Sequence, residues 1–145
     1  MKAPEEVSRR QLLMWSAPVV TAHFLVVVWH LWLLVRVQPG TPSFLPPILI
    51  LVNLLPVAGL ILFAKGSQKL AASLVTVPLG IALVIGFGAH FLSPGNDNVL
   101  HMPPGELRLP FEVSAVLLVV LEAVGAFLGL QMFWVGRGKP AESFH

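Results

Sequence analysis

The chain has 145 residues, of which 56% are hydrophobic and only 11% are charged, and its mean hydropathy is +0.83. Soluble globular domains carry about 25% charged residues, so this composition excludes an ordinary soluble enzyme. The absence of cysteine excludes a secreted domain held together by disulfides. The composition instead predicts an all-α integral membrane protein that forms a single domain, residues 1–145.

Four apolar stretches are each long enough to cross a bilayer, which takes roughly 20 residues of helix. Only helices and closed barrels satisfy backbone groups in lipid, and barrel strands alternate over about ten residues, so uninterrupted runs of this length predict helices. Clusters of turn-forming residues separate the four stretches. We therefore expect a four-helix membrane bundle with spans at residues 11–35, 44–64, 70–92 and 111–135.

The basic residues are distributed unevenly over the connecting segments. Seven of the nine lie before the first span, between the second and third spans, or after the fourth span, which are all on one side of the membrane. Only Arg36 and Arg108 lie on the opposite side. The positive-inside rule then predicts that both termini are cytoplasmic, in a bacterial-type inner membrane. The net charge of +2 reflects this topology, and we expect no nucleic-acid partner.

Three of the predicted helices place a polar side chain near the middle of the membrane: His23, Asn53 and Glu122. Ionisable residues at this depth are costly and often mark ion or proton paths. His23 also shares a helix face with Ser16 and His30, because the three are seven residues apart. The pattern predicts a mid-membrane proton or cation relay, and the alternative is a structural hydrogen bond between helices, which contributes about 0.6 kcal/mol on average.

Small residues accompany the acidic residue of the fourth predicted helix. Gly125 and Gly129 form a small-xxx-small pattern on the face that carries Glu122, and this pattern lets another helix approach closely. We therefore expect both glycines at a helix–helix contact, and we expect the Glu122 side chain to point into the protein rather than into lipid.

A second group of metal-ligating residue types gathers at the outer ends of the predicted helices. His30 and His90 are expected at similar depths on different helices, as a two-histidine haem site requires, and neutral imidazole suits zinc, copper and iron. The spacing matches no known metal signature, so the alternative is a set of interfacial histidines hydrogen-bonded to neighbours. The candidates for a metal or haem site are His30, His90, Asp97, His101 and Glu112.

Residues 109–118 read Leu-Pro-Phe-Glu-Val-Ser-Ala-Val-Leu-Leu and are followed by Gly125-Ala126. This segment resembles the last helix of the J subunit of proton-pumping NADH:quinone oxidoreductase and the related small subunits of multisubunit cation/proton antiporters. The segment His-Phe-Leu-Ser-Pro-Gly at 90–95 is similar to a loop of those antiporter subunits. The resemblance implies an accessory subunit of an energy-converting membrane complex, and Glu112 is the one polar position that it matches.

The sequence contains no nucleotide-binding loop, nucleophile elbow or catalytic cysteine, so it favours a protein that is not an enzyme. Three functions remain open. The first is a non-catalytic subunit that contacts lipid and other membrane subunits and relays protons. The second is a small homo-oligomeric, proton-coupled transporter with Glu122 as its coupling carboxylate. The third is a haem- or metal-binding redox protein that uses the outer histidines.

Overall fold

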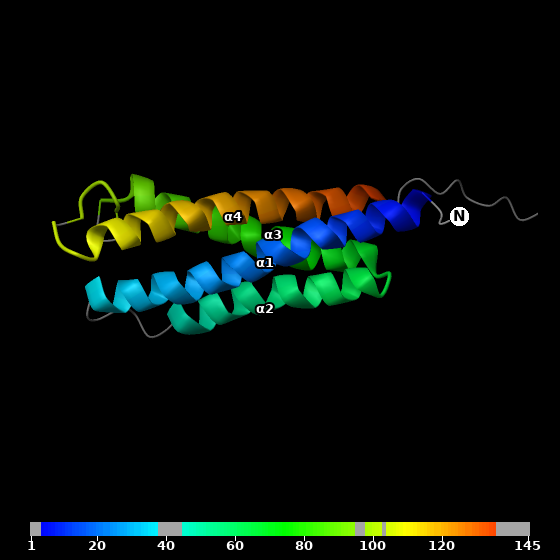
Figure 1. Ribbon diagram of the computed structural model, residues 1–145, viewed down its shortest axis with the longest axis horizontal. Helices are drawn as coiled ribbons and strands as arrows, with labels where there is room; N and C mark the ends of the chain where they lie inside the picture. The colour runs from blue at the N-terminus through cyan, green and yellow to red at the C-terminus, as the bar shows by residue number, and fades with distance from the viewer. Residues whose placement is uncertain (1–3, 38–44, 95–97, 103, 136–145) are drawn as a thin grey trace, which may run out of the picture.

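The computed structural model describes residues 4–37, 45–94, 98–102 and 104–135. Within these ranges every regular element is helical, and successive long helices run in opposite directions along one axis (Figure 1). The elements are α1 Pro4–Val37, α2 Leu45–Ala64, α3 Gln68–Phe87, the π-helical turn η1 Gly88–Leu92, and α4 Arg108–Val135. The predicted all-α, four-helix architecture is confirmed.

The helices agree closely with the predicted spans and mostly extend beyond them. Residue 44, where the second predicted span begins, lies outside the described residues. α1 begins at Pro4, well before the first predicted span, because proline suits a first helical turn, where its missing N–H would have no intrahelical partner. The third predicted span ends in η1 rather than in α-helix, and its sequence contains no signal for that change.

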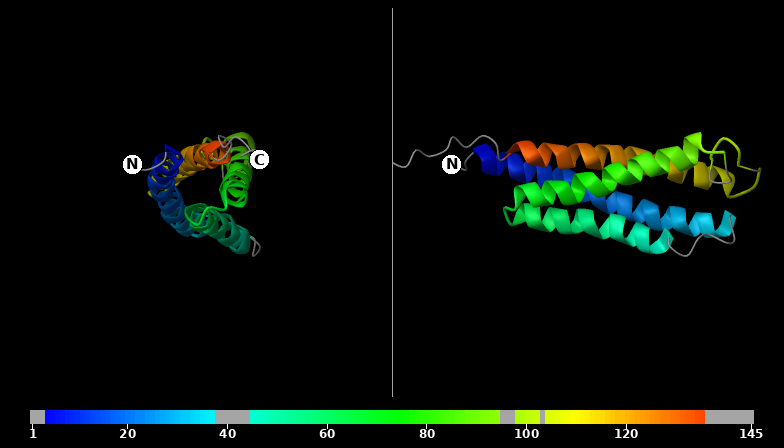
Figure 2. Two further views of the ribbon diagram at one scale, coloured as in Figure 1. Left: turned by 90° about the vertical axis from the view of Figure 1, so that its right-hand side faces the viewer. Right: turned by 180° about the vertical axis from the view of Figure 1, so that it is seen from behind.

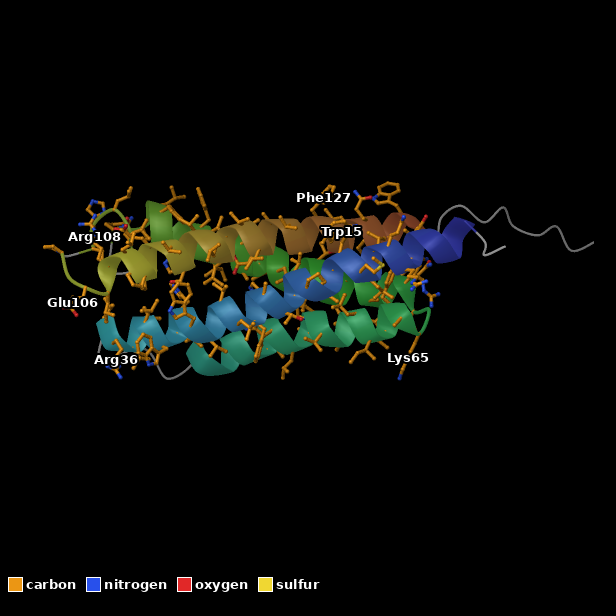
Figure 3. The ribbon with its side chains drawn as sticks, viewed as in Figure 1. Trp15, Arg36, Lys65, Glu106, Arg108 and Phe127 are labelled. Carbon is orange, nitrogen blue, oxygen red and sulfur yellow. The ribbon has the colours of Figure 1, made fainter. Side chains whose placement is uncertain are left out.

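The outer surface of the bundle is apolar over most of its length. Large apolar side chains are exposed along its sides, among them Trp15 and Phe127, whereas Arg36, Lys65 and Arg108 lie at its two ends (Figure 3). Three helical stretches are long and apolar enough to cross a membrane: Ser8–Val37, Gln68–Leu92 and Arg108–Val135. An exposed apolar surface of this extent needs lipid around it, so the protein is a small membrane protein.

Viewed from one end, the four helices form a ring in chain order (Figure 2). α4 packs against both α1 and α3, and α3 also packs against α2, whereas the contact between α1 and α2 is less extensive. α3 and α4 are therefore the helices around which the bundle is organised, and each contacts two neighbours closely.

A tight turn joins α2 to α3 and lies beside the start of α1. Gly66 adopts φ +98°, and the Ser67 N–H donates to the Leu62 carbonyl at 2.9 Å, which is the pattern of a Schellman helix end. The Arg9 guanidinium donates from Nη2 to the Ala64 carbonyl at 2.7 Å. The first turns of α1 and the α2–α3 turn therefore lie at the same end of the bundle.

Two apolar clusters lie toward opposite ends of the bundle interior, with buried polar side chains between them. The cluster at the end of α1 comprises Leu33, Leu34, Val99, Met102, Phe111 and Ala115. The cluster at the α2–α3 turn comprises Phe63, Ala71, Ala72, Val75, Leu79 and Met132. Burial of these side chains holds the helices together, and the polar groups between them are enclosed on both sides.

Glycines bring the backbones of neighbouring helices close together. A Cβ added to Gly129 would lie 2.5 Å from Oγ1 and 2.9 Å from the backbone nitrogen of Thr76, and one added to Gly125 would lie 2.5 Å from Cδ1 of Leu79. On the other side of α3, a Cβ on Gly59 of α2 would lie 2.9 Å from an α3 carbonyl oxygen. Small residues thus permit the α3–α4 and α2–α3 contacts.

We expect Gly129→Ala to destabilise the bundle, because the added methyl group meets the α3 backbone and overpacking costs about 1–3 kcal/mol. Gly80→Ala is the matched control, since a Cβ there meets nothing within 4 Å and alanine favours helix by up to about 1 kcal/mol. Thermal unfolding of both variants in detergent micelles tests this expectation. Equal unfolding temperatures for the two variants would contradict the close α3–α4 contact.

Candidate functional site

His23 on α1 and Glu122 on α4 face each other inside the bundle. Nε2 of His23 lies 3.5 Å from Oε1 of Glu122, and the two residues are 1% and 5% exposed. Each lies at the midpoint of its membrane-spanning stretch, within one residue. The structure therefore brings together two of the three residues predicted for the mid-membrane relay, and the third, Asn53, is buried on α2.

The buried faces of three helices position this pair. On α1, the seven-residue spacing places Ser16, His23 and His30 on the interior side, and all three are buried. On α3, Gly86 lies opposite the carboxylate, because a Cβ added there would be 3.5 Å from Oε2 of Glu122. The missing side chain therefore lets the α3 backbone come close to the acidic group.

The pair retains polar atoms that are not hydrogen-bonded. Within the described part of the chain, neither Nε2 of His23 nor Oε2 of Glu122 has a hydrogen-bond partner. The separation of 3.5 Å also exceeds the roughly 2.7–2.9 Å of a charge-assisted hydrogen bond. A buried polar atom without a hydrogen bond costs about 1–3 kcal/mol, so its retention in the bundle interior calls for an explanation. The imidazole and the carboxylate therefore face each other at 3.5 Å without a hydrogen bond between them.

A second polar cluster lies nearer the far end of α1, where His30 contacts Ser114 of α4. Nδ1 of His30 and Oγ of Ser114 are 2.8 Å apart, and the Ser114 hydroxyl donates its one hydrogen to the Phe111 carbonyl at 2.8 Å. The hydrogen between His30 and Ser114 must therefore come from Nδ1. In the neutral ring Nε2 then carries a lone pair, and it has no partner among the described residues.

His90 adds a second imidazole to this cluster. The ring centroids of His30 and His90 are 4.8 Å apart in an edge-to-face arrangement at 75°. The Phe111 ring closes the cluster at 4.8 Å from His30 and 5.8 Å from His90. His90 belongs to η1, and π-helical turns occur frequently at functional sites. The predicted proximity of the two histidines is therefore realised as a direct ring contact.

The other residues predicted for an outer metal site do not complete a ligand set around these rings. His101 is exposed, and Glu112 accepts a hydrogen bond from Nε of Arg108 at 2.6 Å with its side chain 29% exposed. Asp97 lies outside the described residues. Across the described ranges, no group of three His, Cys, Asp or Glu side chains could hold one metal ion.

The arrangement of His30 and His90 does not suit a haem between them. An iron with two axial imidazoles has a nitrogen about 2 Å away on each side, which puts the ring centroids about 6 Å apart. The two rings here are closer than that and touch edge to face. The two rings would have to separate to take a haem iron between them, and the metal or haem site at these histidines stays a prediction.

Sequence inspection did not identify Ser114, although it sets the orientation of the His30 ring. A signal was present, since Ser114, Leu118 and Glu122 are spaced by four residues and all three are buried on one face of α4. The signal was weak, because a serine in an apolar helix commonly hydrogen-bonds only to its own backbone.

We expect His30 to carry its hydrogen on Nδ1, because the Ser114 hydroxyl is committed to a backbone carbonyl. Nitrogen-15 NMR of the histidine-labelled protein distinguishes the two tautomers. Ser114→Ala removes the acceptor, so the preference for Nδ1–H should weaken at His30 and remain unchanged at the exposed His101. An Nε2–H tautomer at His30 in the unaltered protein would contradict the assignment.

Comparison of the chain with protein-family models, with curated proteins and with solved structures returned no match. The resemblance of residues 109–118 to small subunits of energy-converting complexes stays a prediction. Two buried clusters of polar side chains, His23–Glu122 and His30–His90–Ser114, are the features of the described chain that bear on function.

Proposed function

We propose that this small membrane protein takes up and transfers protons at mid-membrane through the His23–Glu122 pair. The observation that carries the proposal is the 3.5 Å approach of an imidazole to a carboxylate in the interior of a membrane bundle. Proton relays within membranes are built from ionisable side chains of these types that face the bundle interior and pair with one another.

The pair is suited to a proton because its two groups compensate each other. An isolated buried charge costs several kcal/mol even after relaxation. With one proton to share, His23 and Glu122 form either two neutral groups or an ion pair, and neither state leaves a lone charge in the core. One carboxylate and one imidazole also suit a proton better than Ca²⁺, which takes about six to eight oxygen ligands.

The buried polar face of α1 supports a path for protons on both sides of the His23–Glu122 pair. Ser16, His23 and His30 are all buried on the same helix face, and each seven-residue step rises about 10 Å. A hydrogen bond spans only about 3 Å, so in this proposal water molecules bridge the steps. Polar atoms of Ser16 and Thr76 that have no hydrogen-bond partner in the described chain lie on the side of the α2–α3 turn.

The proposal also includes orientation and partners. The basic segments that flank the helices favour cytoplasmic termini in a bacterial-type inner membrane. The exposed apolar sides of the bundle offer surfaces to lipid, to other membrane subunits or to a second copy of the chain. The resemblance of residues 109–118 supports a role for the protein as an accessory subunit of an energy-converting complex.

The test is proton flux into vesicles that contain the purified full-length protein and a trapped pH-sensitive dye, driven by a potassium diffusion potential. Glu122→Gln keeps the shape of the side chain but holds no exchangeable charge, so we expect at least a tenfold lower flux. His23→Asn should lower the flux similarly, because it removes the partner group.

Glu112→Gln is the matched control, because this carboxylate lies on the same helix but pairs with Arg108 near the end of the bundle. Its flux should equal that of the unaltered protein. Thermal unfolding separates a relay from a structural bond. If Glu122→Gln lowers the unfolding temperature without lowering the flux, the pair is structural and the proposal is wrong.

A further inference from the structure

The His30–Ser114 contact leaves one well-defined acceptor in the core. The Ser114 hydroxyl donates to the Phe111 carbonyl and accepts from Nδ1 of His30. Nε2 of His30 therefore holds a lone pair, and it is a buried atom with no hydrogen-bond partner within the described residues. The residue as a whole is only 6% exposed. This atom can accept only a hydrogen-bond donor or a cation.

The same hydrogen-bond chain has the form that supports a metal-binding histidine. Imidazole ligands donate the second ring N–H to an outer group, which fixes the tautomer and the orientation of the ring. Here Ser114 is that outer group, and it is itself anchored to a helix backbone carbonyl. The ring is thus held with its bare nitrogen fixed in direction before any ion arrives.

His90 can supply a second imidazole without rearrangement of the helices. Metal–nitrogen bonds are about 2.0–2.1 Å, so an ion bound to a ring nitrogen lies roughly 3 Å from the ring centroid. Two rings that share one ion from the same side can therefore be as close as the 4.8 Å observed between His30 and His90. The rings meet edge to face in this structure, so the His90 ring would turn about its side-chain torsions to bring a nitrogen toward an ion held by Nε2 of His30.

We propose that His30 and His90 bind one divalent transition-metal ion, with Nε2 of His30 as a ligand and Ser114 as its positioning residue. The site provides two protein ligands, because no third His, Cys, Asp or Glu completes it among the described residues. The remaining coordination positions are open to water or to an external ligand. Among divalent ions Cu²⁺ binds nitrogen ligands most strongly, so it is the most sensitive probe.

The test is titration of the full-length protein, purified in detergent without a polyhistidine tag, with Cu²⁺ alone. Calorimetry should give one ion per chain, and electron paramagnetic resonance should show hyperfine coupling to two nitrogens. His30→Ala and His90→Ala should each weaken binding at least tenfold. Ser114→Ala should weaken binding about 10- to 100-fold while keeping two-nitrogen coupling, as expected for loss of an outer-shell partner.

His101→Ala is the matched control, because this histidine is exposed on the loop at the same end of the bundle. His23→Asn tests the mid-membrane pair as a competing site, and both variants should bind Cu²⁺ like the unaltered protein. Should His30→Ala fail to fold, His30→Gln and Ser114→Ala carry the test. The proposal is overturned if no stoichiometric site is found, or if binding survives the His30 and His90 variants or is lost in His101→Ala or His23→Asn.

Discussion

A polar side chain inside a lipid bilayer has to find its partner within the protein, and the interior of this bundle is arranged around that constraint. α1 turns Ser16, His23 and His30 inward, and α4 opposes the two histidines with a carboxylate and a hydroxyl. Apolar clusters toward both ends enclose these groups. The closest approach of an acidic to a basic side chain in the bundle interior, that of Glu122 to His23, therefore lies across the α1–α4 interface.

α4 connects the two polar clusters because one of its faces serves three purposes. Gly125 and Gly129 bring the helix against α3, Glu122 reaches His23, and Ser114 holds His30. Movement of α4 relative to α3 would shift all of these contacts together. The close glycine contacts therefore act on the polar sites as well as on stability, since they set the depth and rotation of the helix that carries both partners.

Much of this arrangement could be predicted from the chain. Hydropathy and length predicted the helices, and the seven-residue interval predicted that Ser16, His23 and His30 share one face of α1. Counting from the ends of the spans placed His23 and Glu122 at one depth. The expected outer pocket was less accurate. His101 is exposed. Glu112 pairs with Arg108, which lies one helical turn before it, and the four-residue spacing of these opposite charges in the sequence favours such a pair.

The sequence by itself determined that this is a helical membrane protein and at what depth each polar group lies, because hydropathy and helical rise are local properties of the chain. Tertiary structure alone decided which groups meet: Glu122 with His23 at 3.5 Å, and His30 with both Ser114 and His90. The physical reason is that side-chain distances across helices depend on their rotation and separation. Those are set by the packing of small residues such as Gly129 against the backbone of a neighbouring helix.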